Sequence, residues 1–185
     1  MSSRIGLCSF AGGVALFLWG ALSWAVLPMR VDNLQEFNEE DKVAAVLDAS
    51  TNGHGVYVYP KGDGKLANGP FAFVIFRPGA TMPRSRLMVR GFLVCVLAAG
   101  LMSNLLLQSS VTTYGGRILF CVVVCLTAGV LVRLSDWNWW HYPTSYILLE
   151  FLHLLVSGAV LGLAIGKLIV PSDSISESKP SLAKS

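Results

Sequence analysis

Four side chains capable of acid–base or ligand chemistry lie at helical spacing in the last hydrophobic segment of the chain. They stand at i, i+4, i+7 and i+11 and so share one stripe of a helix: Tyr146, Glu150, His153 and Ser157. A carboxylate or an imidazole inside a hydrophobic segment is costly, and such groups pair with one another or serve proton, ion or metal sites. This stripe is therefore the first place to look for a site.

Further polar residues are expected at the same level of the membrane as Glu150. Antiparallel packing of successive spans would bring Arg90 and Arg133 to that leaflet, beside Asp136 and His141 of the preceding loop. The predicted polar cluster contains Arg90, Arg133, Asp136, His141, Glu150 and His153.

Three interpretations of this cluster compete. The first is structural: Glu150 is neutralised by Arg133 or Arg90, and His153 is satisfied by a hydroxyl or a water. The second is a metal site, because Glu-x-x-His is the ligand pair that helices of di-iron bundles contribute, although this chain has only one such pair. The third is a proton or ligand pathway. The structural interpretation leads, because cationic partners for the carboxylate can be named, and no cofactor is indicated.

The chain around the stripe has 185 residues, 54% of them hydrophobic and 14% charged, with a mean hydropathy of +0.60. Soluble domains carry about 25% charged residues, so this composition indicates an integral membrane protein. A net charge of +3 with interspersed signs excludes a nucleic-acid binder.

A transmembrane helix needs about 20 apolar residues, and four segments meet or approach that length: 5–27, 87–107, 118–134 and 146–170.

We expect a mainly α-helical polytopic protein with four transmembrane helices and a small extramembrane α+β insertion between the first two. The predicted order is helix 1 (1–27, a signal anchor), the extramembrane domain (28–86), helix 2 (87–107), a short loop (108–117), helix 3 (118–134), an aromatic interfacial loop (135–145), helix 4 (146–170) and a disordered tail (171–185). The first segment could instead be a cleaved signal peptide, but its length and its two tryptophans, Trp19 and Trp24, favour an anchor.

The orientation is weakly determined, because basic residues flank both ends of the spans equally. Arg4 precedes the first span, whereas Asp32 and Glu36 follow it, which favours both termini in the cytoplasm. The expected location is the inner membrane of a bacterium.

The extramembrane domain is predicted to hold a helix over 39–49, capped by Asn38, and two strands over 56–59 and 71–76. A two-stranded sheet is rarely stable alone in water, and no cysteine in 28–86 is present to form a disulfide. The second strand is apolar on both faces, and the single helix could cover only one of them. The domain is therefore expected to need a partner.

Aromatic and apolar residues supply candidate contact surfaces. The tryptophans near the fourth span are explained by an aromatic belt at the membrane interface. The alternative is a specific contact surface for a lipid, a ring-shaped ligand or a partner subunit. The interface candidates are Trp137, Trp139, Trp140, Tyr142, Phe71, Phe73 and Ile75. Two overlapping GxxxG patterns suit close helix packing, within the chain by default or with a second subunit: Gly158, Gly162 and Gly166.

No catalytic motif is evident, so the sequence favours an accessory, assembly or structural subunit of a membrane complex. Its expected partners are the lipid bilayer and another membrane protein or a second copy of itself. The alternative is a small transporter or a metal- or redox-binding protein with its polar site at Glu150 and His153.

Overall fold

The computed structural model describes residues 2–26, 34–62, 69–79 and 81–169, which belong to two compact units. The membrane unit comprises residues 1–33 and 84–185, and the extramembrane unit comprises residues 34–83. The described residues are mainly helical, with one small two-stranded sheet, as the sequence predicts. The predicted tail at 171–185 lies outside the described residues.

Four long helices make up the described part of the membrane unit: α1 (Ser2–Val26), α4 (Arg84–Gln108), α5 (Tyr114–Trp140) and α6 (Thr144–Ile165). Each is long and apolar enough to cross a membrane. Leucines remain exposed on their outer faces, for example Leu97, Leu131 and Leu148. Helices that are apolar on all sides are typical of a bilayer environment. The chain is a multi-pass membrane protein.

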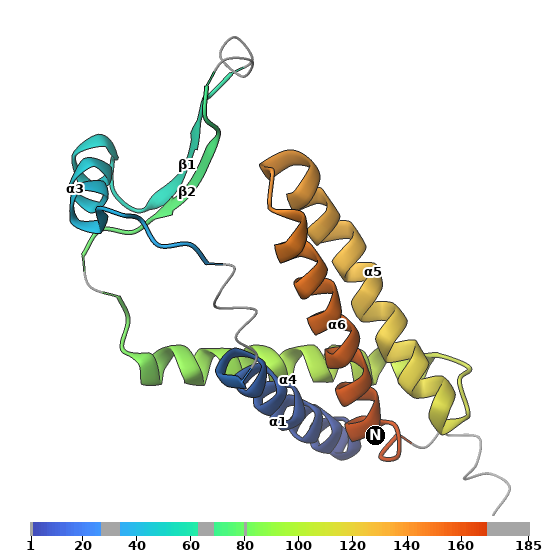
Figure 1. Cartoon of the computed structure of the whole chain (residues 1–185). Helices are drawn as coiled ribbons and strands as arrows, with labels where there is room; N and C mark the ends of the chain where they lie inside the picture. Colours follow the sequence, from blue (N-terminus) through green and yellow to red (C-terminus); the bar gives the residue numbers. More distant parts are fainter. Residues whose placement is uncertain (1, 27–33, 63–68, 80, 170–185) are drawn as a thin grey trace, which may run out of the picture. The chain divides into compact units, whose positions relative to one another are not determined.

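The membrane helices form two antiparallel pairs, α1 with α4 and α5 with α6, and α1 also packs on α6 (Figure 1). Small residues allow this close packing. A Cβ atom on Gly13 of α1 would lie 2.8 Å from the Cα of Val96 in α4, and one on Gly12 would lie 2.8 Å from a methyl carbon of Leu161 in α6. The buried core follows these contacts: Cys8, Ala99, Met102, Leu106, Cys121, Leu161, Ile165 and Ile169.

The glycines predicted to pack helices lie against α5 of the same chain. A Cβ on Gly158 would lie 2.7 Å from the Cα of Val122, and a Cβ on Gly162 would lie 2.6 Å from the Cα of Ile118. Only glycine permits main chains to approach this closely. Gly166 stands at the C-cap of α6, where a Cβ would lie 3.1 Å from the ring of Tyr114. The GxxxG surface is thus occupied within the chain.

The helices extend beyond the predicted spans. The predicted aromatic loop at 135–145 is mostly helical, because α5 continues to Trp140 and α6 already begins at Thr144. The connection is reduced to His141–Pro143, and His141 has a left-handed φ of 54°. The boundary was misplaced because the last turns of α5 are polar and aromatic, and hydropathy detects only the hydrocarbon-spanning part of a helix.

The extramembrane unit contains α3 (Glu40–Ser50), β1 (Gly55–Tyr59) and β2 (Ala72–Phe76). The two strands pair antiparallel, from Gly55 opposite Phe76 to Tyr59 opposite Ala72, so the predicted hairpin is confirmed. The prediction that Asn38 caps the helix is wrong. The N-cap position is Glu39, and its side chain makes no capping hydrogen bond.

One face of the hairpin, here called the open face, carries only apolar side chains: Val56, Val58, Phe73 and Ile75. Val56 and Ile75 are 63% and 70% exposed. On the opposite face the Tyr57 hydroxyl donates to Gly53 O at 2.8 Å and accepts from the amide of Asn52 at 3.1 Å. No residue of α3 is buried, and α3 makes no extensive contact with either strand among the described residues.

Candidate functional site

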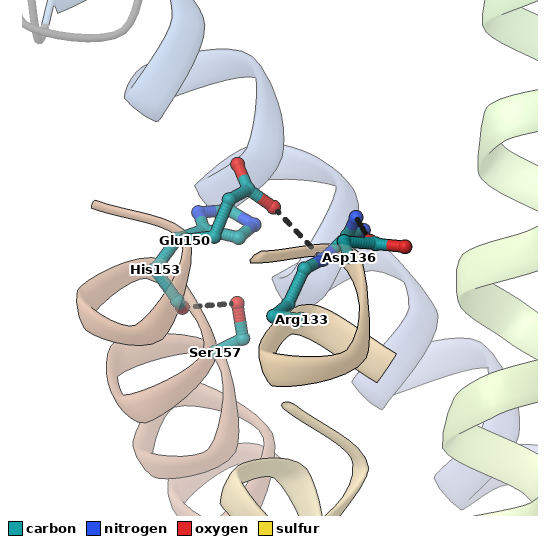
Figure 2. Close-up of polar contacts among 5 residues, drawn as sticks. All are labelled: Arg133, Asp136, Glu150, His153 and Ser157. Atoms are coloured by element: carbon teal, nitrogen blue, oxygen red, sulfur yellow. Dashed lines mark hydrogen bonds and ion pairs between the residues drawn. The ribbon is translucent and has the colours of Figure 1, made fainter. Parts of the chain in front are cut away.

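The antiparallel register of α5 and α6 brings three charged groups of the predicted cluster together. Arg133 Nη1 donates to Asp136 Oδ2 at 3.0 Å, one turn further along α5. Arg133 Nε lies 3.6 Å from Oε2 of Glu150 on α6 (Figure 2). One guanidinium therefore serves two carboxylates, and the three groups carry a formal charge of −1.

The Glu150 carboxylate is the most protected of these groups. Its side chain is 9% exposed, compared with 35% for Arg133 and 23% for Asp136. It stands six residues after Thr144, about 9 Å along the helix. A carboxylate at that position is stable only when a cation or hydrogen-bond donors face it. Its ion pair with Arg133 matches the structural interpretation of the cluster.

His153 and Ser157 complete the stripe on α6 in an unexpected way. The Ser157 hydroxyl donates to the main-chain carbonyl of His153 at 2.7 Å and not to its imidazole (Figure 2). The imidazole stacks on the indole of Trp19 in α1, with ring centroids 5.7 Å apart and an interplanar angle of 17°. A flat contact of this kind suits neutral and protonated histidine alike. The site is therefore assembled from α1, α5 and α6.

Trp19 is the site residue that sequence reasoning missed, since its position near the end of a span suggested an interfacial anchor. Its indole Nε1 is buried and has no hydrogen-bond partner among the described residues. Whether Trp19 faces α6 depends on the rotation of α1 about its own axis. The sequence of α1 is apolar on all sides and therefore does not show which face packs on α6.

The other predicted site residues occupy different places. Arg90 is exposed on α4. His141 belongs to an open recess of about 390 Å³ at the α5–α6 connection, lined also by Trp137, Asn138, Tyr142, Pro143 and Thr144. Trp137 Nε1 donates to Thr144 Oγ1 at 3.2 Å across this connection. Trp139 and Trp140 are exposed, and Tyr142 packs its ring 5.5 Å from that of Tyr146.

The apolar interface candidates lie on or next to β2. Phe71 precedes the strand and is half-buried, as is Phe73, whereas Ile75 is exposed. They belong to the extramembrane unit.

A second buried charge is Arg117, which directly precedes the predicted third span at 118–134. It is 8% exposed, and its guanidinium donates to four main-chain carbonyls. At the end of α6 it reaches Gly166 O at 2.7 Å and Ile169 O. In the α4–α5 connection it reaches Thr112 O at 2.8 Å and Val111 O at 3.3 Å. Arg117 thereby satisfies carbonyls that the end of a helix leaves unpaired.

The donor set does not define a metal centre. Within the described ranges, no three His, Cys, Asp or Glu side chains gather as a metal-binding group. Comparison with protein-family models, with curated proteins and with solved structures finds no match.

The shared guanidinium predicts an asymmetry between two substitutions. Glu150→Gln leaves Arg133 paired with Asp136, so we expect the unfolding free energy to fall by only about 1 kcal/mol. Arg133→Leu leaves two carboxylates without that cation, one of them buried, and we expect a loss of about 3 kcal/mol. Urea unfolding of the purified protein in detergent measures both.

Glu150→Gln, together with His153→Ala, separates the structural interpretation from a transport or redox role. If these two variants leave stability unchanged but abolish an ion, proton or electron flux in vesicles, the structural interpretation of the site is contradicted. Thr127→Val is a suitable control on α5, since the exposed Thr127 hydroxyl bonds only to Val123 O of its own helix.

Proposed function

We propose that this multi-pass membrane protein is a non-catalytic accessory, assembly or structural subunit of a membrane protein complex. Its extramembrane unit and the aromatic residues at the α5–α6 connection form the contact surfaces. We place it in a bacterial inner membrane with both termini in the cytoplasm, on the strength of Arg4 before α1 and Asp32 and Glu36 after it.

The observation that carries this proposal is the absence of a core in the extramembrane unit. Of its described residues, only Pro60 is buried. Large apolar side chains stay exposed on each element and on the segment before α3: Phe37, Val46, Val56 and Ile75. A soluble unit of this size that folded by itself would bury a contiguous apolar cluster.

A protein partner that covers the open face would stabilise the hairpin. Burying one Ile or Val side chain contributes about 1.5–3 kcal/mol, so covering the open face would supply several kcal/mol. A two-stranded hairpin is marginal without such cover. A protein partner both stabilises the hairpin and gains an apolar contact surface.

The alternative, a small transporter or a metal- or redox-binding protein centred on Glu150 and His153, has weaker support. The carboxylate of Glu150 is engaged by Arg133, and the imidazole is stacked on Trp19. Both groups are held by neighbours within the chain, which leaves the extramembrane unit as the surface that most needs a partner.

Hydrogen exchange tests the proposal directly. In native membrane vesicles we expect the amides of β1 and β2 to be protected, because a partner stabilises the hairpin. After dissociation to single chains in a strong detergent, we expect their exchange to accelerate by about 100-fold, equivalent to about 2.7 kcal/mol of lost protection.

Amides of α5 serve as the internal control, because helices of the membrane unit keep their own hydrogen bonds in both states. A monodisperse single chain that retains slow exchange and protease resistance in 55–59 and 72–76 would contradict the proposal. Such a result would mean that the unit is stable without a cover.

A further inference from the structure

The extramembrane unit carries two apolar surfaces with largely exposed residues. The first is the open face of the hairpin, where Val56 and Ile75 are exposed. The second is a stripe on α3 formed by Val43, Val46 and Leu47, which recur at helical spacing. Val46 is 62% exposed, and the other two are half-buried. Among the described residues, α3 has no extensive packing with either strand.

The chain's own α3 is held on the wrong side to cover its own open face. Only four residues, 51–54, connect α3 to β1. Tyr57 binds Asn52 and Gly53 of that connection, and its side chain projects from the opposite face of the hairpin to Val56. The connection is thus fixed on the face opposite the open face. Val46 of the stripe on α3 remains largely exposed and can contact another molecule.

The segments that carry the two surfaces have opposite charge. Residues 34–50, around α3, contain five acidic residues and one basic residue: Glu36, Glu39, Glu40, Asp41, Asp48 and Lys42. In the described residues around the hairpin, 53–62 and 69–79, Lys61 and Arg77 are basic and no residue is acidic. The α3 segment is therefore net negative and the described part of the hairpin net positive, which favours contact between them.

Their lengths also match. The 11 residues of α3 span about 16 Å at 1.5 Å per residue. The five residues of each strand span about 17 Å at 3.4 Å per residue. A helix laid along the strands would place its acidic first turn near one end of the hairpin and Asp48 towards the other, within reach of Lys61 and Arg77.

We infer that a second copy of this chain covers the open face, with α3 of each copy packed on the hairpin of the other. A two-fold dimer satisfies both surfaces of both copies at once, because the same pair of contacts occurs twice. The inference rests on the proposed function, since it names the partner that the extramembrane unit requires.

Complementation between two variants tests this arrangement in full-length protein reconstituted in lipid nanodiscs or mild detergent. Val46→Lys disrupts only the α3 stripe, and Ile75→Glu disrupts only the open face. We expect each variant alone to weaken self-association by about 100-fold. When the two variants carry different tags and are mixed, they should pair. In the mixed dimer, the unchanged α3 of the Ile75→Glu chain packs on the unchanged hairpin of the Val46→Lys chain. In the other contact, the introduced lysine faces the introduced glutamate.

Ala72→Glu is the matched control, since Ala72 is exposed on the same strand but faces the other side. It should leave the dimer intact. A wild-type protein that is monomeric, or a dimer unaffected by either variant, overturns the inference. The inference is also overturned if the two variants fail to pair in the mixture. This outcome counts when each variant alone is monomeric and keeps the wild-type unfolding temperature.

Experiment can distinguish a failure of the dimer inference from a failure of the proposed subunit role. If wild-type protein is monomeric yet Ile75→Glu releases a different, stoichiometric protein from the native complex, the subunit role holds and the partner is not a second copy. If the single chain is protected in β1 and β2 with no partner, both proposals are wrong.

Discussion

Gly162→Ala is expected to lower the unfolding free energy of the membrane unit by about 3 kcal/mol, although it adds a single methyl group. The added Cβ would lie 2.6 Å from Ile118 Cα and 3.3 Å from Ile118 O. These are main-chain atoms of α5, so the clash cannot be relieved by a side-chain rotation. The helices would have to separate, and the contacts on either side of Gly162 would loosen with them. Thermal or urea unfolding in detergent measures the loss.

Gly20→Ala on α1 is the matched control. Apart from its chain neighbours and the nearby backbone of its own helix, no atom of the described residues lies within 4 Å of a Cβ built at Gly20. Alanine favours helix over glycine, so we expect a gain of about 0.5 kcal/mol instead of a loss. Equal effects of the two substitutions would contradict the direct packing of α6 on the main chain of α5. Gly158→Ala should resemble Gly162→Ala, because its Cβ would lie 2.7 Å from Val122 Cα.

The second large effect is expected from Arg117→Leu, with a loss of about 3 kcal/mol. The substitution removes charge-assisted hydrogen bonds to four carbonyls, two of them at the end of α6. Each such bond contributes about 1.5–3 kcal/mol, but water at the membrane surface replaces part of that contribution. Arg117→Lys should recover only part of the loss, because an ammonium group cannot reproduce a planar fork with five donors.

Arg86→Leu controls for the loss of one positive charge near the membrane, since Arg86 is exposed at the start of α4. We expect its unfolding free energy to change by less than about 0.5 kcal/mol. Hydrogen exchange locates the effect: the last turns of α6 should open in Arg117→Leu and remain protected in Arg86→Leu. Unchanged protection in both would show that the carbonyl contacts do not hold the end of α6.

The number of spans could be predicted from the sequence because a transmembrane helix requires a long apolar run, and four such runs are present. The hairpin could be predicted for a similar reason, since Val-Tyr-Val-Tyr and Phe-Ala-Phe-Val-Ile-Phe are short β-rich runs between glycines and prolines. Helix ends were less predictable. The turns from Asp136 to Trp140 look like a loop by hydropathy, yet they continue α5 at the membrane surface.

The candidate site was predictable only in part. Glu150 and Arg133 could be matched because α5 and α6 are consecutive and therefore pack antiparallel. The contact between Trp19 and His153 could not, since it joins helices far apart in the sequence. Arg117 was unpredictable for another reason: its acceptors are main-chain carbonyls, which every residue has and no side-chain pattern reveals.

The antiparallel pairing of α1 and α4 bears on how much change the segment between them can tolerate. Because the two helices pack side by side, the last described turn of α1 and the first turn of α4 lie at the same end of one helical pair. The main chain therefore leaves and re-enters this pair at neighbouring points. Closely spaced attachment points of this kind tolerate changes in the length and sequence of the segment that they delimit.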